Sequence, residues 1–208
     1  MEKSHAITGI LGGMLVEHRG MRPEVHASAW IAPTAVVCGD VRVGPDARIL
    51  WNAVVTAEDG RVEIGERCVV MEHALVRGRS KHPVVVERDV LIGPHAHVNG
   101  ARIGSQAFIA TGAALFPGAT VGTRAEVRIR GVVHVNSAVP DGGMVPIGWV
   151  AVGDRVFPPG AHDEIWEVQE SLDFPGTVYG ERRGDDIMAR VMPRQTAWLG
   201  AHRDDRVL

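Results

Sequence analysis

An aliphatic residue recurs at every sixth position along most of this chain, beginning at residue 25. A small or second aliphatic residue usually stands two positions before it. Side chains two positions apart on a strand point to the same side, so both members of each pair are expected to face inward. A period of six is typical of one flat side of a three-sided β-solenoid, with Gly at many of the corners. The repeating positions are Val25, Ile31, Val37, Val43, Ile49, Val55, Ile64, Val70, Val76, Val86, Ile92, Val98, Ile103, Ile109, Leu115, Val121, Val127, Val133, Val139 and Val145.

The repeat divides the chain into four parts. Residues 1–24 are a lead-in segment, and residues 25–157 form the all-β solenoid. The sixfold phase breaks twice, and we expect a loop at each break, over Thr56–Gly60 and Gly78–Pro83, because insertions in solenoids project from one face.

The chain beyond residue 157 has a different pattern. Residues 158–181 begin with a Pro-Pro-Gly break, and an apolar stripe with early acidic residues predicts a helix over His162–Asp173 that packs along the solenoid. Residues 182–208 form a charged tail that is either ordered on a partner or loosely attached.

Composition narrows the class of protein. The 208 residues carry a formal charge of −3, which argues against a nucleic-acid or anionic-membrane partner. No apolar run is long enough for a membrane span, and Met1–Gly20 makes a poor signal peptide. Two cysteines, Cys38 and Cys68, fit a reducing cytoplasm better than a disulfide framework. We therefore expect a cytoplasmic protein that acts on a small molecule.

Four histidines gather on one predicted side of the prism. Counting in phase puts His73 and His95 at the same lateral position on successive coils, about 4.8 Å apart. His97 faces the same outward way as His95, and His134 lies two coils farther along. Three imidazoles and a water describe a catalytic zinc site, so the sequence predicts that these residues bind zinc or another divalent metal. The same histidines could instead hydrogen-bond at a subunit interface.

Three further residues beside the histidines are the candidate catalytic groups. Glu72 could orient a histidine or take a proton, and Arg77 and Asn99 lie next to the cluster. Arg77 could bind a carboxylate or phosphate, or it could pair with an acidic residue such as Glu58. Cys68 is expected in the core, whereas Cys38 faces outward without a histidine near it in phase. The remaining histidines are expected on the surface: His5, His18, His26, His82, His162 and His202.

The repeat, the two breaks and the C-terminal helix resemble the gamma-class carbonic anhydrase family and the wider hexapeptide transferases. The resemblance covers roughly residues 25–175 and includes Trp51–Val55 before the first break and Asn99–Gly104. It implies a left-handed parallel β-helix, a homotrimer and sites in the clefts between subunits. It also implies a zinc ion held by three histidines, but the matching positions here are Arg77, Pro94 and Asn99.

Three functions follow as hypotheses. The first is a carbonic-anhydrase-like, metal-dependent lyase or hydrolase with a relocated histidine cluster. The second is a hexapeptide acyltransferase that uses an acyl-CoA and a histidine base without a metal. The third is a non-catalytic trimeric scaffold. The resemblance to the gamma class places the first ahead.

Overall fold

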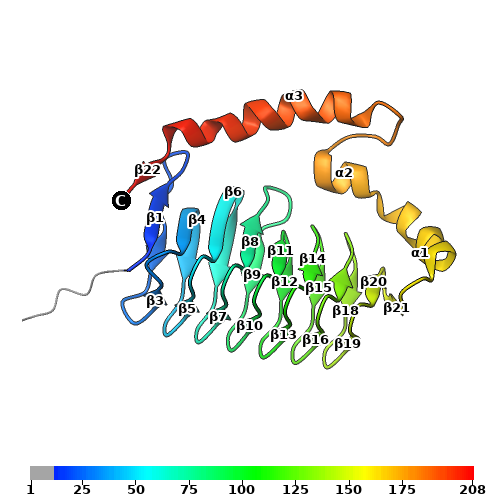
Figure 1. Cartoon of the computed structure of the whole chain (residues 1–208), viewed down its shortest axis with the longest axis horizontal. Helices are drawn as coiled ribbons and strands as arrows, with labels where there is room; N and C mark the ends of the chain where they lie inside the picture. Colours follow the sequence, from blue (N-terminus) through cyan, green and yellow to red (C-terminus); the bar gives the residue numbers. More distant parts are fainter. Residues whose placement is uncertain (1–11) are drawn as a thin grey trace, which may run out of the picture.

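The computed structural model describes residues 12–208, which fold into a three-sided parallel β-solenoid followed by helices (Figure 1). Two sheets account for the solenoid, one of fifteen strands and one of seven. The larger sheet wraps two faces, because the long strands β4 and β6 run round a corner. The hexapeptide-repeat solenoid predicted from the sequence is thus confirmed.

Each face stacks one strand per coil. The first face contains β1 (Met14–Glu17), β4 (Val36–Val43), β6 (Val54–Ile64), β8 (Leu75–Gly78), β11 (His97–Asn99), β14 (Ala114–Leu115), β17 (Val132–Val133), β20 (Val150–Val152) and β21 (Arg155–Phe157). The second contains β2 (Glu24–Val25), the ends of β4 and β6, β9 (Val84–Val86), β12 (Arg102–Ile103), β15 (Thr120–Val121) and β18 (Ala138–Val139). The third contains β3 (Trp30–Ile31), β5 (Arg48–Ile49), β7 (Val69–Val70), β10 (Leu91–Ile92), β13 (Phe108–Ile109), β16 (Glu126–Val127) and β19 (Met144–Val145).

The core is the stack of repeating aliphatic residues. All of the predicted positions are buried except Val25, which is half-buried. The small residues two positions earlier are buried beside them, as at Ala35, Ala53 and Ala113. Cys68 is also fully buried, as predicted, and its Sγ lies 2.7 Å from the Glu87 carbonyl oxygen. Small and aliphatic side chains therefore alternate to fill a narrow prism without large aromatic residues.

The two breaks in the repeat differ. Gly78–Pro83 contains a turn closed by a bridge between Arg79 and His82, as expected for a loop. Thr56–Gly60 is not a separate loop, because β6 runs unbroken from Val54 to Ile64. Its register against β4 shifts between Gly39 and Val41, so β6 carries extra residues outward at this corner. That excursion positions Glu58 on the first face.

The C-terminal quarter forms helices that run from the far end of the solenoid back to its N-terminal end (Figure 1). Helix α1 (His162–Gln169) and the 3-10 turn η1 (Glu170–Leu172) cap the far end, where α1 contacts β20. Helices α2 (Phe174–Tyr179) and α3 (Ile187–Leu199) then run back over the first face toward the N-terminal coil. The 3-10 turn η2 (Gly200–Asp204) leads into β22 (Arg206–Val207), which pairs with β1.

The segment boundaries in the structure differ from those expected. The lead-in contains β1, which pairs in parallel with β4, so the solenoid sheet begins before residue 25. The charged segment 182–208 packs on its own chain, since Val191 is buried and β22 pairs with β1. His5 and most of Met1–Gly20, the segment assessed as a signal peptide, lie in residues 1–11, which the structure does not describe. Among residues 12–208, no helix combines the length and apolarity that a membrane span requires.

Candidate functional site

A line of chemically active side chains faces outward on the first face. Cys38 pairs in register with Thr56, Thr56 with Arg77, and Arg77 with Asn99. The same register continues through Phe116 to His134, whose rings lie 6.3 Å apart. These six residues (Cys38, Thr56, Arg77, Asn99, Phe116 and His134) are called the outward ladder below. Parallel pairing brings residues from six coils into one row about 4.8 Å per step.

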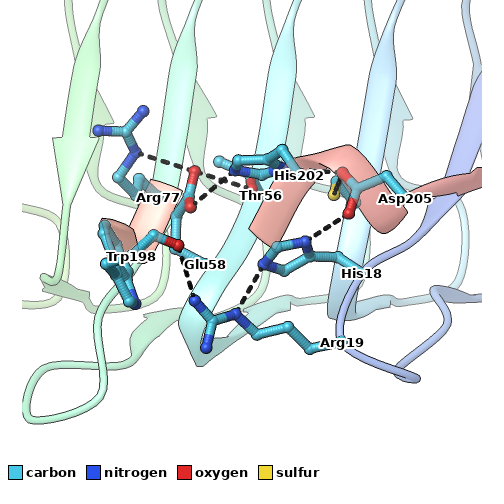
Figure 2. Close-up of polar contacts among 9 residues, drawn as sticks. His18, Arg19, Thr56, Glu58, Arg77, Trp198, His202 and Asp205 are labelled. Carbon is cyan, nitrogen blue, oxygen red and sulfur yellow. Dashed lines mark hydrogen bonds and ion pairs between the residues drawn. The ribbon is translucent and has the colours of Figure 1, made fainter. Parts of the chain in front are cut away.

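The C-terminal segment covers this ladder at both ends. Phe174 of α2 lies 6.1 Å from Phe116 and 5.7 Å from His134, measured between ring centroids. At the other end, Trp198 lies between the guanidinium groups of Arg19 and Arg79, at 5.8 and 5.2 Å. His202 and Asp205 follow directly and reach the ladder beside Thr56, as Figure 2 shows.

Glu58 is the centre of a network of ion pairs at the N-terminal end of the ladder. Its carboxylate is only 5% exposed and lies 3.0 Å from His202 Nε2 and 3.7 Å from Arg77 Nε (Figure 2). Thr56 Oγ1 donates a long hydrogen bond of 3.5 Å to the same carboxylate. Cationic groups from two sides thus compensate the charge of a nearly buried carboxylate.

Asp205 extends this network to the first strand. Its two carboxylate oxygens lie 2.6 Å from His18 Nδ1 and 2.8 Å from His202 Nδ1. Although burial opposes the shift, the hydrogen bonds of His202 and His18 lower the pKa of Asp205. The hydrogen bond to Asp205, with another to Glu58, raises the pKa of His202. We call His18, Glu58, His202 and Asp205 the C-terminal network.

The other half of the ladder has buried polar atoms without partners. Within residues 12–208, four such atoms accept or donate no hydrogen bond: Arg77 Nε, His97 Nε2, Asn99 Oδ1 and His134 Nδ1. Asn99 as a whole is 8% exposed. Burial, with Arg77 nearby, lowers the pKa of His97, and burial lowers the pKa of His134. Both imidazoles are therefore neutral at neutral pH. These four residues are called the unpartnered group.

The structure brings only some of the predicted metal ligands together. His73 and His95 stack in parallel, with ring centroids 4.9 Å apart and planes 1° apart, which agrees with the phase count. Both are exposed and sit at corners with positive φ. His97 and His134 lie elsewhere on the face, separated by Phe116. Glu72 supplies its carbonyl oxygen to the His95 N–H at 3.0 Å.

A different set of metal-ligating side chains gathers at the N-terminal end of the ladder. Across residues 12–208, one group of three or more His, Cys, Asp or Glu has all its ligand atoms within 4.8 Å of one another. It consists of His18, Cys38, His202 and Asp205. The four predicted histidines form no such group within one chain, so their joint metal site stays a prediction for an assembly of chains.

The zinc of the resembling family does not fit at its own positions here. Arg77 is a permanent cation with no lone pair to offer a metal, and its buried Nε, which makes no hydrogen bond, lies 3.7 Å from the Glu58 carboxylate. Asn99 offers only a neutral amide, and Pro94 has no donor atom in its side chain. No chemical step of this site can therefore pass through a zinc ion held by these three residues.

Sequence reasoning missed the C-terminal network. His18 and His202 were expected on the surface, yet His18 is only 2% exposed. Cys38 was expected to have no histidine near it in phase, and the two histidines that approach it come from outside the repeat. The phase count could place only residues inside the repeat, and both histidines lie outside it. The one available signal was chemical: four of the ten histidines (His5, His18, His162 and His202) and two Asp-Asp pairs lie outside the repeat.

A cavity of about 360 Å³ opens beside the ladder. The Gly78–Pro83 turn forms one wall, and α2 and α3 form the other. Three of its lining residues are cationic (Arg79, Lys81 and Arg194) and one is acidic (Asp59). His82 also lines it. Burial and the cations Lys81 and Arg79 lower the pKa of His82. The cavity therefore has an excess of positive charge.

The curated proteins similar to this chain include carbonic anhydrases and an uncharacterized transferase of Bacillus subtilis. The chain is 29% identical over 126 residues to the mitochondrial gamma carbonic anhydrase 1 of Arabidopsis thaliana, covering 58% of this chain and 46% of that protein. It is 26% identical over 109 residues to a carbonic anhydrase of Geobacillus kaustophilus, covering 52% and 60%. No family model matches the chain.

The solved structures agree in fold. A hexapeptide transferase family protein from Anaplasma phagocytophilum superposes with a TM-score of 0.60 at 23% identity, covering 77% of this chain and 92% of that one. At that identity the likeness establishes the solenoid alone. The chain spans about half the length of the curated relatives it matches, between 46% and 60% of the two named above.

Proposed function

From the premise that this chain is a divergent, gamma-carbonic-anhydrase-like member of the hexapeptide-repeat left-handed β-helix proteins, we propose that it is an acyltransferase. It acts without a metal at the family's zinc position. The observation that carries the proposal is the unpartnered group, in which a guanidinium, an amide and two neutral imidazoles lie on one face.

Buried polar atoms without partners are rare in folded proteins, because each loses its hydrogen bonds to water. Four of them on one face are explained if a ligand supplies the missing partners. Arg77 keeps 32% of its side chain exposed, so a ligand can reach its guanidinium from solvent. A guanidinium donates to the oxygens of carboxyl and acyl groups, and the free amide oxygen of Asn99 accepts from a ligand N–H or O–H.

His97 is the candidate base. Its lowered pKa leaves Nε2 free to take a proton from an acceptor hydroxyl or amine at neutral pH. The acceptor then attacks the acyl carbonyl, Arg77 stabilises the oxyanion that develops, and the CoA thiolate leaves. Asn99 is the neighbour of Arg77 in register, and its Oδ1 accepts a hydrogen bond from an N–H or O–H of the bound ligand.

The neighbouring basic cavity supports acyl-CoA as the donor. Arg79 stands two residues beyond Arg77 on the same strand-to-turn segment, and Lys81 and Arg194 line the same space. Positive side chains of this kind attract the phosphates of a nucleotide carrier.

Thermal stabilisation by acetyl-CoA tests this function. We expect acetyl-CoA to raise the Tm of the wild-type protein, and to fail to do so in Arg77→Met. Arg102→Met is the matched control, because Arg102 is exposed on β12 of another face. Absence of any shift with acetyl-CoA in the wild type would overturn the proposal, as would an equal shift in Arg77→Met.

The second candidate is the carbonic-anhydrase-like, metal-dependent lyase or hydrolase in a homotrimer. The stacked pair of His73 and His95 favours it, since two exposed imidazoles 4.9 Å apart can meet ligands of another subunit. His97 and His134 of a second copy, with its Glu72, would complete such a site.

This second candidate is tested by three other measurements. Light scattering must give three chains per particle, and the trimer must bind a divalent metal that His95→Ala releases. Carbon dioxide hydration by stopped flow must then depend on that metal. A protein that binds neither acetyl-CoA nor a metal at His95 would leave the trimeric scaffold as its function.

A further inference from the structure

The N-terminal end of the ladder brings together metal-binding side chains from three distant segments. His18 follows β1, Cys38 lies in β4, and His202 and Asp205 come from the C-terminal segment (Figure 2). Their ligand atoms all lie within 4.8 Å of one another. His18 and Cys38 are 2% and 5% exposed, so this is a built site and not a chance surface cluster.

The donor set has the chemistry of a transition-metal site. Two imidazoles, a thiolate and a carboxylate are the ligand types that zinc takes in tetrahedral sites, with bonds of about 2.0–2.3 Å. Such bonds separate neighbouring ligand atoms by roughly 3.3–3.8 Å. The widest separations, up to 4.8 Å, must therefore shorten, and the contacts of Asp205 with His18 and His202, at 2.6 and 2.8 Å, must lengthen.

We infer that His18, Cys38, His202 and Asp205 bind one divalent transition-metal ion of the zinc class. This site is separate from the unpartnered group and goes beyond the proposed function. It ties the C-terminal segment to the first coils of the solenoid.

The surroundings of two ligands sharpen the inference. Glu58 lies 3.0 Å from His202 Nε2 and would accept the hydrogen of that nitrogen while Nδ1 faces the metal. Arg19 acts in the opposite sense, because its Nε donates to His18 Nε2 at 3.1 Å. An Nε2 that accepts this hydrogen bond carries no hydrogen. A neutral imidazole that binds a metal through Nδ1, in contrast, carries its hydrogen on Nε2. Arg19 must therefore release His18, and removing its guanidinium favours the metal.

Metal analysis of the whole protein tests the site. The protein is incubated with zinc, dialysed and measured per chain, for the wild type, Cys38→Ser and His202→Gln. The control is the double variant His73→Ala/His95→Ala, which removes the exposed, stacked histidine pair elsewhere on the solenoid. We expect about one zinc per chain in the wild type and in this control, and at least a tenfold loss of affinity in the other two variants.

Cobalt(II) substitution adds a readout that depends on the thiolate. A sulfur-to-cobalt charge-transfer band is expected in the wild type and absent in Cys38→Ser. If Cys38→Ser does not fold, His202→Gln gives the same metal test, since the His202 side chain is 36% exposed and lies outside the core. Arg19→Met is expected to bind zinc about tenfold more tightly in competition with a chelator.

Three results would overturn the inference. They are no zinc in the wild type after incubation, zinc that persists in Cys38→Ser and His202→Gln, and a cobalt complex without the thiolate band.

Discussion

The two halves of the outward ladder use similar residues in opposite ways. At the N-terminal half, Glu58 and Asp205 each contact two cationic or imidazole groups, so the polar atoms are satisfied within the chain. At the C-terminal half, Asn99, His97 and His134 each keep a buried polar atom without a partner. Both halves lie on the same face under the same C-terminal segment.

The difference lies in what covers each half. Polar residues of η2 and its neighbours cover the first half and supply partners, whereas Phe174 and Phe116 border His134 and supply none. A buried polar network stabilises the fold when every polar atom in it has a hydrogen-bond partner. Buried polar atoms without a partner in the chain are explained where a ligand supplies that partner. The first half therefore holds the C-terminal segment, and the second half is where a substrate is expected.

The largest effect is expected at Glu58. Glu58→Gln keeps the shape but leaves Arg77 and His202 without a compensating charge, which should lower the free energy of unfolding by about 2–3 kcal/mol. Urea unfolding measures the change. The control is Glu63→Gln, whose 3.6 Å pair with Arg61 is exposed and should contribute less than about 0.5 kcal/mol. Equal midpoints for the two variants would refute a central role for Glu58.

A smaller effect is expected where α3 is anchored. Trp198→Ala removes a ring that lies between two guanidinium groups, and the local opening free energy of the segment should fall by about 1–2 kcal/mol. Hydrogen exchange should then accelerate at the amide of Leu208, which donates to the Leu15 carbonyl. Trp166→Ala is the control, because Trp166 stacks on Arg183 at 4.4 Å far from this anchor.

The solenoid could be predicted from the sequence because its cause is local and repeated. Each coil requires an inward aliphatic residue at a fixed phase, so twenty positions reported the same period. The phase also placed His73 above His95, which the parallel rings agree with. It failed at Thr56–Gly60, where extra residues extend β6 instead of leaving the sheet, because the pairing of Val62 with Val84 keeps the strand intact.

The site could be predicted only in part. Arg77 and Asn99 were identified as neighbours because both stand in the repeat. The partners of Glu58 could not be, because His202 is 144 residues away and nothing periodic connects them. Which residues of a non-repeating tail return to the first coil depends on tertiary packing of α2 and α3, and no local pattern encodes that.

The unpartnered half makes a pH-dependent prediction. Burial and Arg77 hold the pKa of His97 below the ordinary imidazole value of about 6.5. Folding thus favours the neutral ring. Its contribution to stability is complete above about pH 6.5 and is lost as the pH falls toward the folded pKa.

NMR titration of the imidazole protons measures the pKa of His97 directly. Arg77→Met should raise the pKa of His97, which stays below 6.5 because burial is the larger cause. The pKa of His134 is the internal control, because burial lowers it and Arg77 does not contribute. An unchanged His97 in the Arg77→Met variant would contradict the contact between the two side chains.

The smallest change in the free energy of unfolding is expected at Asn99. Unlike the change at Glu58, it should not be a loss of stability. Asn99→Leu replaces an amide whose Oδ1 has no partner with an apolar group of similar size. Removing an unsatisfied polar atom is close to neutral or stabilising, so the free energy of unfolding should stay equal or rise by up to about 1 kcal/mol. The same variant should lose the thermal shift with acetyl-CoA, because the amide oxygen that accepts a hydrogen bond from the ligand is gone. Urea unfolding and the acetyl-CoA shift, measured on one preparation, separate the two roles. A loss of stability comparable to that of Glu58→Gln would mean that Asn99 serves the fold and not a ligand.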